Sequence, residues 1–208
     1  MSPFTIRDVD PERDATACAA IYAPHVEASA TSFEERAPSA DELSTRIERL
    51  TATHPWLVAE SAGEVIGYAY SCRHRERPAY RWSVDVSVYV ADGWARQGVG
   101  RSLYEGLFER LRRQGFRVAC AGITLPNEAS VALHERLGFT PIGTYRGIGW
   151  KEGAWRDVGW WQLDLAANGH DPPAEPLRPD ALCSARLPLA HVRERDCGAD
   201  RGRRDGGA

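Results

Sequence analysis

Hydrophobic and polar residues alternate most regularly in the middle of the chain. In the segment 84–90, four valines occupy every second position, with polar or aromatic residues between them. A period of two predicts a β-strand whose valines share one face. Leucines then recur at every fourth position of the segment 103–111, the spacing of an amphipathic helix. A glycine-containing turn at 96–100 joins the two, so the predicted unit is strand, turn and helix.

This turn has the features of an anion site. The first N–H groups of a helix have no partner within the helix, and the helix dipole adds positive potential there. Gly98 and Gly100 would let a ligand approach the main chain, and Arg96 and Arg101 would add charge. The alternative is that the two glycines serve only to form a tight turn between strand and helix, without binding a ligand. A dinucleotide fingerprint is excluded because Leu103 stands where a third small residue is required, and the P-loop sequence is absent.

The remaining pattern predicts a mixed sheet. The expected strands lie at 4–7, 56–60, 64–70, 118–123, 139–145 and 155–165, and the expected helices at 11–22, at 39–50 and from 126 to a glycine cap at 138. Helices fall between hairpins instead of alternating regularly with strands. We therefore expect an α+β fold in three layers, with helices on both faces of the sheet. The basic connector 73–81 is either a binding loop or a solvated one.

Composition and charge narrow the class of protein. The chain has 208 residues, 43% hydrophobic, which suffices for one domain, expected at 1–167. The segment 168–208 is rich in Pro, Gly and balanced charges and is expected to be a disordered tail. A net charge of -3 gives no general attraction to nucleic acid or membrane. The polar start and the absence of a long apolar run predict a cytoplasmic protein.

The cysteines predict neither a disulfide framework nor a metal site. Five are present, an odd number, and no two have C-x-x-C spacing (Cys18, Cys72, Cys120, Cys183 and Cys197). We therefore expect no metal cofactor.

Several motifs in order resemble one enzyme family. They are V-D-V-S-V-Y-V, the turn Q-G-V-G, P-N-E-A-S-V-A-L-H-E-R-L-G-F, and G-W-K-E-G-A-W-R-D-V-G-W-W-Q-L-D. Together they resemble a GCN5-related N-acetyltransferase (GNAT) of the phosphinothricin N-acetyltransferase type, over residues 6–165. The resemblance implies a mostly antiparallel sheet with a V-shaped opening between two central strands that holds acetyl-CoA. It also implies a homodimer and, for this type, a role in herbicide resistance.

The resemblance assigns the cofactor contacts by position. The pantetheine arm would bond the main chain of the central strand, the pyrophosphate would lie on the glycine turn, and a later asparagine would touch the cofactor. The residues are Val88, Tyr89, Val90, Arg96, Gln97, Gly98, Val99, Gly100, Arg101 and Asn127. One departure is that Ala95 and Arg96 stand where the family usually has Arg or Gln, often followed by glycine.

Acetyl transfer to an amine requires a proton acceptor. Neutralising an amine of pKa ~10.4 at pH 7 costs roughly 4–5 kcal/mol. Asp85 is the candidate base, because a carboxylate in a valine-rich strand is costly unless it has a partner or a purpose. The resemblance implies Glu at this position, so the shorter Asp85 is expected to act through a water. The alternative is a structural carboxylate satisfied by Arg or backbone.

Further catalytic residues follow from the resemblance, and acceptor-binding residues follow from their positions on the loop before Asp85 and on the irregular loop after the first helix. Tyr104 would protonate the departing thiolate, and His134 would lie near the site. The alternatives are a core tyrosine and a helix-surface or core histidine. Arg75, Tyr80 and Phe33 would bind the acceptor, because a guanidinium pairs well with carboxylate or phosphinate oxygens.

The predicted function is acetylation of a small amino-acid-like amine, such as phosphinothricin or methionine sulfoximine, by direct attack in a ternary complex. One alternative is acetylation of a protein N-terminus or lysine. Another is a CoA-binding regulatory module that has lost transferase activity.

Overall fold

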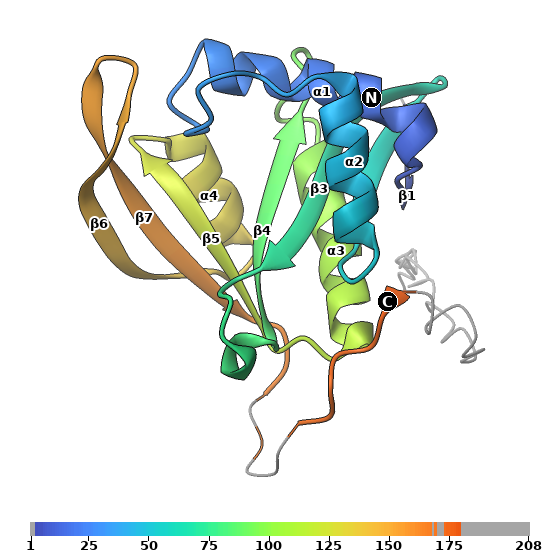
Figure 1. The fold of residues 1–208 in the computed structure, drawn as a ribbon, viewed down its shortest axis with the longest axis vertical. Coiled ribbons are helices and arrows are strands. Elements are labelled where there is room, and N and C mark those ends of the chain that lie inside the picture. Colours follow the sequence, from blue (N-terminus) through green and yellow to red (C-terminus); the bar gives the residue numbers. More distant parts are fainter. Residues whose placement is uncertain (1–2, 168, 170–172, 180–208) are drawn as a thin grey trace, which may run out of the picture.

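The computed structural model describes residues 3–167, 169 and 173–179, so most of the predicted tail lies outside the described residues. One seven-stranded sheet has the order β1-β2-β3-β4-β5-β7-β6. Its strands are β1 (Thr5–Asp8), β2 (Trp56–Ser61), β3 (Glu64–Arg73), β4 (Ser83–Val90), β5 (Val118–Leu125), β6 (Thr140–Lys151) and β7 (Ala154–Asp164). The helices are α1 (Pro11–Glu27), α2 (Ala40–Thr51), α3 (Val99–Gln114), α4 (Glu128–Arg136) and a short 3-10 turn, η1 (Pro78–Tyr80). The predicted mixed sheet with helices on both faces is confirmed (Figure 1).

Two hydrophobic cores lie on opposite faces of the sheet. The leucine stripe of α3 is fully buried against the face formed by the even-numbered valines of β4. On the other face, α1 and α2 pack on Trp56 and Tyr68, with Tyr89 at the margin of this cluster. The predicted strand at 84–90, with its valines on one face, is therefore confirmed. The same alternation places Asp85 on the α1 and α2 side of the sheet.

Some element boundaries differ from the prediction. Helix α1 continues to Glu27 instead of ending at residue 22, because Val26 is fully buried against the core, which outweighs the helix-breaking tendency of Pro24 in its last turns. Strand β6 extends from the expected 139–145 to Lys151, since its glycine-rich second half pairs with β7 after an irregularity following Tyr145. The capping box of Ser39 and Glu42 is confirmed.

The sheet splits between its two central strands. β4 and β5 are parallel, and they pair only from Ser83 to Asp85, opposite Val118 to Cys120. Beyond this point β4 stays paired with β3 and β5 with β7, so the two strands diverge (Figure 1). Peptide groups on the inner edges past the split are therefore available to a ligand that enters between them. Within the described residues, no helix is long and apolar enough to span a membrane.

Candidate active site

A cavity lies at the split between β4 and β5. Its walls come from residues 86–89 of β4, residues 121–124 of β5, Tyr104 of α3 and Thr31. Three residues from the α4 region complete them, namely the N-cap Asn127, Ser130 in the first turn and His134 in the last turn. The structure thus brings together predicted residues from three separate motifs around one opening. Asn127 is the N-cap of α4, where its side chain accepts a hydrogen bond from the Ser130 N–H (3.1 Å).

The turn before α3 ends beside this opening and exposes backbone donors. Gly98 is the N-cap with φ of 86°, and it has no side-chain cap within the described residues. The first N–H groups of α3 and the helix dipole therefore suit an anion. A Cβ on Gly100 would lie 3.7 Å from a Val90 methyl and 3.8 Å from a Val88 methyl, so the helix start packs closely under β4.

Several side chains of this turn are engaged within the protein. Arg101 forms an ion pair with Glu105 (2.7 Å), and the Gln97 amide donates to the Gly93 carbonyl (2.6 Å). Val99 is buried in the core. The anion-binding capacity of the turn therefore resides mainly in its main chain. Arg96 has φ of 60°, a conformation that favours glycine, at a position where the resembled family often has glycine.

Tyr104 and His134 form a buried pair on the α3 side of the opening. The Tyr104 hydroxyl donates to Nε2 of His134 (3.0 Å), because Nδ1 of the same ring donates to the Ser130 carbonyl (2.7 Å). Burial raises the pKa of Tyr104, and burial lowers the pKa of His134. The phenol thus stays protonated and the imidazole neutral at pH 7.

This pair changes the predicted role of Tyr104. A phenol whose pKa lies well above 10 does not readily give its proton to a thiolate of pKa near 8.5. A hydrogen bond from the phenol to a developing negative charge is the chemistry that remains. The two residues lie close enough to act together, which the sequence alone did not establish.

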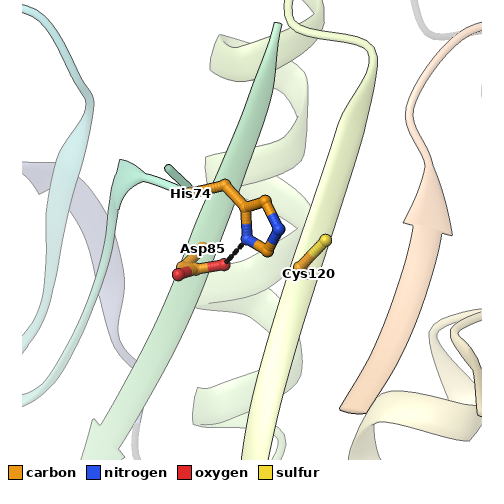
Figure 2. Close-up of side chains that lie close together, drawn as sticks. All are labelled: His74, Asp85 and Cys120. Atoms are coloured by element: carbon orange, nitrogen blue, oxygen red, sulfur yellow. Dashed lines mark hydrogen bonds and ion pairs between the residues drawn. The ribbon is translucent and has the colours of Figure 1, made fainter. Parts of the chain in front are cut away.

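Asp85 has a hydrogen-bond partner, His74, that the sequence pattern does not indicate. Nδ1 of His74, from the connector between β3 and β4, donates to Oδ1 of Asp85 (2.6 Å). Figure 2 shows the imidazole lying between the Asp85 carboxylate and the Cys120 sulfur. Burial raises the pKa of Asp85 above its usual range, while the hydrogen bond from His74 opposes that rise. A carboxyl group of this kind is more basic than an exposed one.

Asp85 and Tyr104 approach the opening from opposite faces of the sheet. Tyr104 belongs to the core under α3, whereas Asp85 alternates with the buried valines of β4 and faces the other side. A molecule bound on the α3 side and a second one on the α1 and α2 side would therefore meet in the split. The candidate base and the candidate hydrogen-bond donor therefore lie on opposite faces of the sheet.

The acceptor residues predicted from sequence are only partly brought together. The Arg75 guanidinium lies over the Trp160 ring (5.6 Å), and the rings of Tyr80 and Trp160 both make edge contacts with His74 (6.1 and 5.9 Å). Arg75 and Tyr80 thus border Asp85. Phe33 lies elsewhere, against β6, where a Cβ on Gly149 would overlap its ring.

Two residues near Asp85 were missed for different reasons. His74 stands among the arginines of the basic connector, and the guanidinium groups of that connector are the expected ligands of an anionic acceptor. Trp160 sits in a run of tryptophans that predicts a strand, and it packs against the backbone of Gly122 on β5. The residue types themselves, a histidine in the connector and a tryptophan in the last strand, are consistent with a site. The sequence does not show, however, that either side chain lies next to Asp85.

Comparison with known proteins identifies relatives over most of the chain. A model of the acetyltransferase (GNAT) domain matches residues 6–160. A phosphinothricin N-acetyltransferase of Streptomyces viridochromogenes is 41% identical over 166 residues, which are 80% of this chain and 89% of that protein. An L-methionine sulfoximine/L-methionine sulfone acetyltransferase of Salmonella typhimurium is 36% identical over 163 residues, 78% of this chain and 95% of that protein.

A solved structure has the same fold. It is a GNAT superfamily phosphinothricin acetyltransferase (Pat) from Sinorhizobium meliloti in complex with AcCoA. The TM-score is 0.80 at 34% identity, covering 86% of this chain and 97% of that one.

Proposed function

The chain belongs to the GNAT family of acetyltransferases, and from that premise we propose that it transfers acetyl from acetyl-CoA to the amine of a small amino-acid-like acceptor. Phosphinothricin and methionine sulfoximine represent the acceptor class, because they appear in the names of the relatives. The observation that carries the proposal is the split between β4 and β5, with Asp85 on one face and Tyr104 on the other.

The main chain would hold the cofactor. The inner edge of β4 at Val88, Tyr89 and Val90 has the hydrogen-bonding groups that a pantetheine arm requires. The uncapped start of α3 at Gly98 suits its pyrophosphate, and Asn127 borders the same cavity. These residues fit acetyl-CoA, which supplies the acetyl thioester when bound.

Asp85 would accept the proton of the attacking amine. An ammonium group is not nucleophilic, so a base must take a proton before or during attack. The raised pKa of Asp85 makes it a better acceptor than an exposed carboxylate, and His74 holds its orientation. We assign His74 as a positioning residue that acts through Asp85. The proton passes to the carboxylate directly or through a water.

Tyr104 would stabilise the departing thiolate. Its hydroxyl can turn from His134 toward negative charge that develops on sulfur. His134 keeps the phenol oriented toward the opening, since its own Nδ1 is fixed by the Ser130 carbonyl. Catalysis by this pair is electrostatic in our proposal.

The acceptor would lie on the Asp85 side. Arg75 stacks on Trp160 and can pair with the carboxylate or phosphinate of an amino-acid-like substrate. Tyr80 closes the opposite side of His74. Phe33 remains a predicted contact at the outer margin, adjacent to Thr31, which borders the cavity. A small anionic acceptor is favoured over a protein segment by this cationic, aromatic surround.

Thiol release with an amine panel tests the proposal. The full chain is mixed with acetyl-CoA and phosphinothricin, methionine sulfoximine, free lysine or an N-terminal peptide. Preferred turnover of the first two is expected. Turnover only with peptides would favour protein acetylation, and tight acetyl-CoA binding without any turnover would favour a regulatory module. In a parallel thermal-shift measurement, acetyl-CoA but not NAD or ATP is expected to raise Tm.

We also propose a homodimer. The hairpin of β6 and β7 exposes large apolar side chains, namely Ile142, Tyr145, Ile148, Trp150 and Trp155. Such a patch is costly in water and suits a second copy of the chain. Light scattering is expected to give twice the mass of one chain. A cytoplasmic location stays a prediction, and resistance of a host to phosphinothricin would follow if that amine is accepted.

A further inference from the structure

Three side chains with different metal-binding atoms converge beside the opening. His74, Asp85 and Cys120 each offer one ligand atom, and these atoms all lie within 4.8 Å of one another. They come from the connector before β4, from β4 and from β5, and they face one another in Figure 2. Their separation in sequence explains why the cysteine spacing predicted no metal site.

The fold holds this cluster in place. Asp85 and Cys120 are the last partners in the parallel pairing of β4 and β5, so their side chains share one face. The His74 ring is held between Tyr80 and Trp160 by edge contacts. None of the three residues needs a new backbone position in order to meet the others.

We propose that His74, Asp85 and Cys120 form a binding site for a divalent transition-metal ion of the Zn²⁺ class, whose occupancy inhibits acetyl transfer. Imidazole nitrogen, carboxylate oxygen and thiolate sulfur are the ligand types that Zn²⁺ takes. Tetrahedral coordination places such atoms roughly 3.5 Å apart. Side-chain rotation would adjust the three ligand atoms to this spacing, and an ion bound by both Nδ1 of His74 and Asp85 would replace their 2.6 Å hydrogen bond. A water would complete the four-coordinate shell.

The charge of the three ligands and their exposure to solvent are consistent with reversible binding of a divalent ion. The carboxylate and a thiolate together supply two negative charges, which a dication neutralises, although the nearby Arg75 opposes this in part. The side chains of His74 and Asp85 are 16% and 27% exposed, so an ion can reach them from solvent, whereas Cys120 is buried beneath them.

The same cluster does not suit a cysteine nucleophile. Burial raises the pKa of Cys120 to about 11, and the Asp85 carboxylate adds to that rise. The thiol therefore keeps its proton at pH 7 unless a cation is present. Metal binding releases that proton, so affinity is expected to fall as pH falls.

Inhibition, unlike binding itself, rests on the proposed function. A metal on Asp85 occupies the carboxylate that would accept the proton of the amine. It also fills the position beside Arg75 where the acceptor would lie. Chelation would restore activity, which distinguishes this effect from zinc-induced aggregation.

Co²⁺ is the probe for binding, because a thiolate ligand produces a near-ultraviolet charge-transfer absorption. The full chain carries Cys183→Ser and Cys197→Ser, which removes two cysteines outside the described residues, and is freed of metal with EDTA. Titration is expected to give this absorption at one Co²⁺ per chain, and Zn²⁺ should bleach it. No absorption, or absorption that Zn²⁺ does not bleach, would overturn the proposal.

Matched variants locate the site. Cys120→Val should abolish the absorption, whereas Cys18→Ala, at a buried cysteine in the other core, should retain it. If Cys120→Val does not fold, Asp85→Asn serves instead, with the absorption kept and affinity reduced by at least about 10–100-fold, the loss that removal of an outer-shell partner alone causes. Absorption unchanged in Cys120→Val, or affinity unchanged in Asp85→Asn, would refute the assignment. If Co²⁺ binds as expected but Zn²⁺ does not slow thiol release, the metal site is confirmed and the proposed inhibition of acetyl transfer is refuted.

Discussion

At the scale of single residues, Asp85 is the group whose surroundings matter most. It is partly buried, it accepts a short hydrogen bond from His74, and the net effect is a raised pKa. Because its pKa is raised in the folded state, the fold loses stability as the pH rises from the ordinary carboxyl pKa through the raised pKa of Asp85, and the loss is complete above it. A residue that costs stability in its charged form is a reasonable site for proton transfer.

Asp85→Asn should lower kcat/KM by roughly 10²–10⁴ at neutral pH, the usual contribution of a general base. Activity of the wild type should rise with pH as Asp85 ionises, and this limb should be absent from the variant. The deficit should shrink toward the pKa of the amine. The measurement is a pH–rate profile with acetyl-CoA saturating, and identical profiles would show that Asp85 is structural.

Tm provides the control for Asp85→Asn. Because the pKa of Asp85 is raised in the folded state, the variant should be no less stable than the wild type at pH 7.5. A lost rate together with a retained Tm would locate the defect in chemistry.

His74 can be separated from a merely structural residue by its effect on pH dependence. His74→Ala removes a hydrogen bond to a charged group, worth about 1.5–3 kcal/mol, so kcat/KM should fall roughly tenfold or more. The acid limb of the profile should also move to higher pH, because that bond lowers the pKa of Asp85. His74→Asn keeps a donor near the Nδ1 position and should restore part of both effects. A rate loss without movement of the limb would contradict the positioning role.

At the scale of elements, the start of α3 has a left-handed backbone conformation and no capping side chain among the described residues. Gly98 adopts a left-handed conformation and lacks a capping side chain, which leaves the first N–H groups for a ligand. Gly93, in the preceding loop, has the same φ of 86° and nothing within 4 Å of an added Cβ. The two glycines thus share a conformation but differ in distance from the helix start.

Gly98→Ala and Gly93→Ala should therefore each destabilise the protein by about 1 kcal/mol, the cost of a left-handed alanine. This corresponds to roughly 2–4 °C in Tm for a chain of this size. Only Gly98→Ala should also weaken acetyl-CoA binding, measured by calorimetry, because it disturbs the donors. Equal weakening by both variants would mean that the affinity follows global stability.

At the scale of the whole molecule, the segment after β7 is divided. Residues 173–179 contact the domain, where Leu177 exchanges two hydrogen bonds with Gln114 (both 2.7 Å). The Trp82 indole donates to the Ala174 carbonyl (2.8 Å). The amino-acid composition predicts that all of 168–208 is one disordered tail, which does not hold for the contacts of 173–179. The predicted disorder of 180–208 concerns residues outside those described.

Truncation after Pro179 should leave Tm and turnover unchanged. Truncation after Ala167 removes the contacts to Gln114 and Trp82 and should cost about 1–3 kcal/mol, with turnover retained at 25 °C. Circular dichroism melts of both variants check this. Equal Tm values would show that the contacts of 173–179 contribute nothing measurable.

Much of the fold was predictable from sequence because its signals are local. A period of two in 84–90, a period of four in 103–111 and the capping box at Ser39 depend on neighbouring residues alone, and the structure confirms all three. The glycine turn was likewise predicted as a helix start with free donors. Family resemblance then supplied the V-shaped opening and the cofactor, which periodicity does not encode.

Tertiary structure alone decided which side chains meet. His74, Asp85 and Cys120 are brought together by strand register and a connector, and Tyr104 meets His134 across two helices. It also decided that Phe33 packs against Gly149 of β6, whereas Arg75 stacks on Trp160 of β7. The physical reason is that periodicity reports the face of each element but not the register or crossing that pairs one element with another. The sequence by itself therefore determined the elements and the anion-binding turn, while burial and contact in the folded chain determined the protonation behaviour of the site.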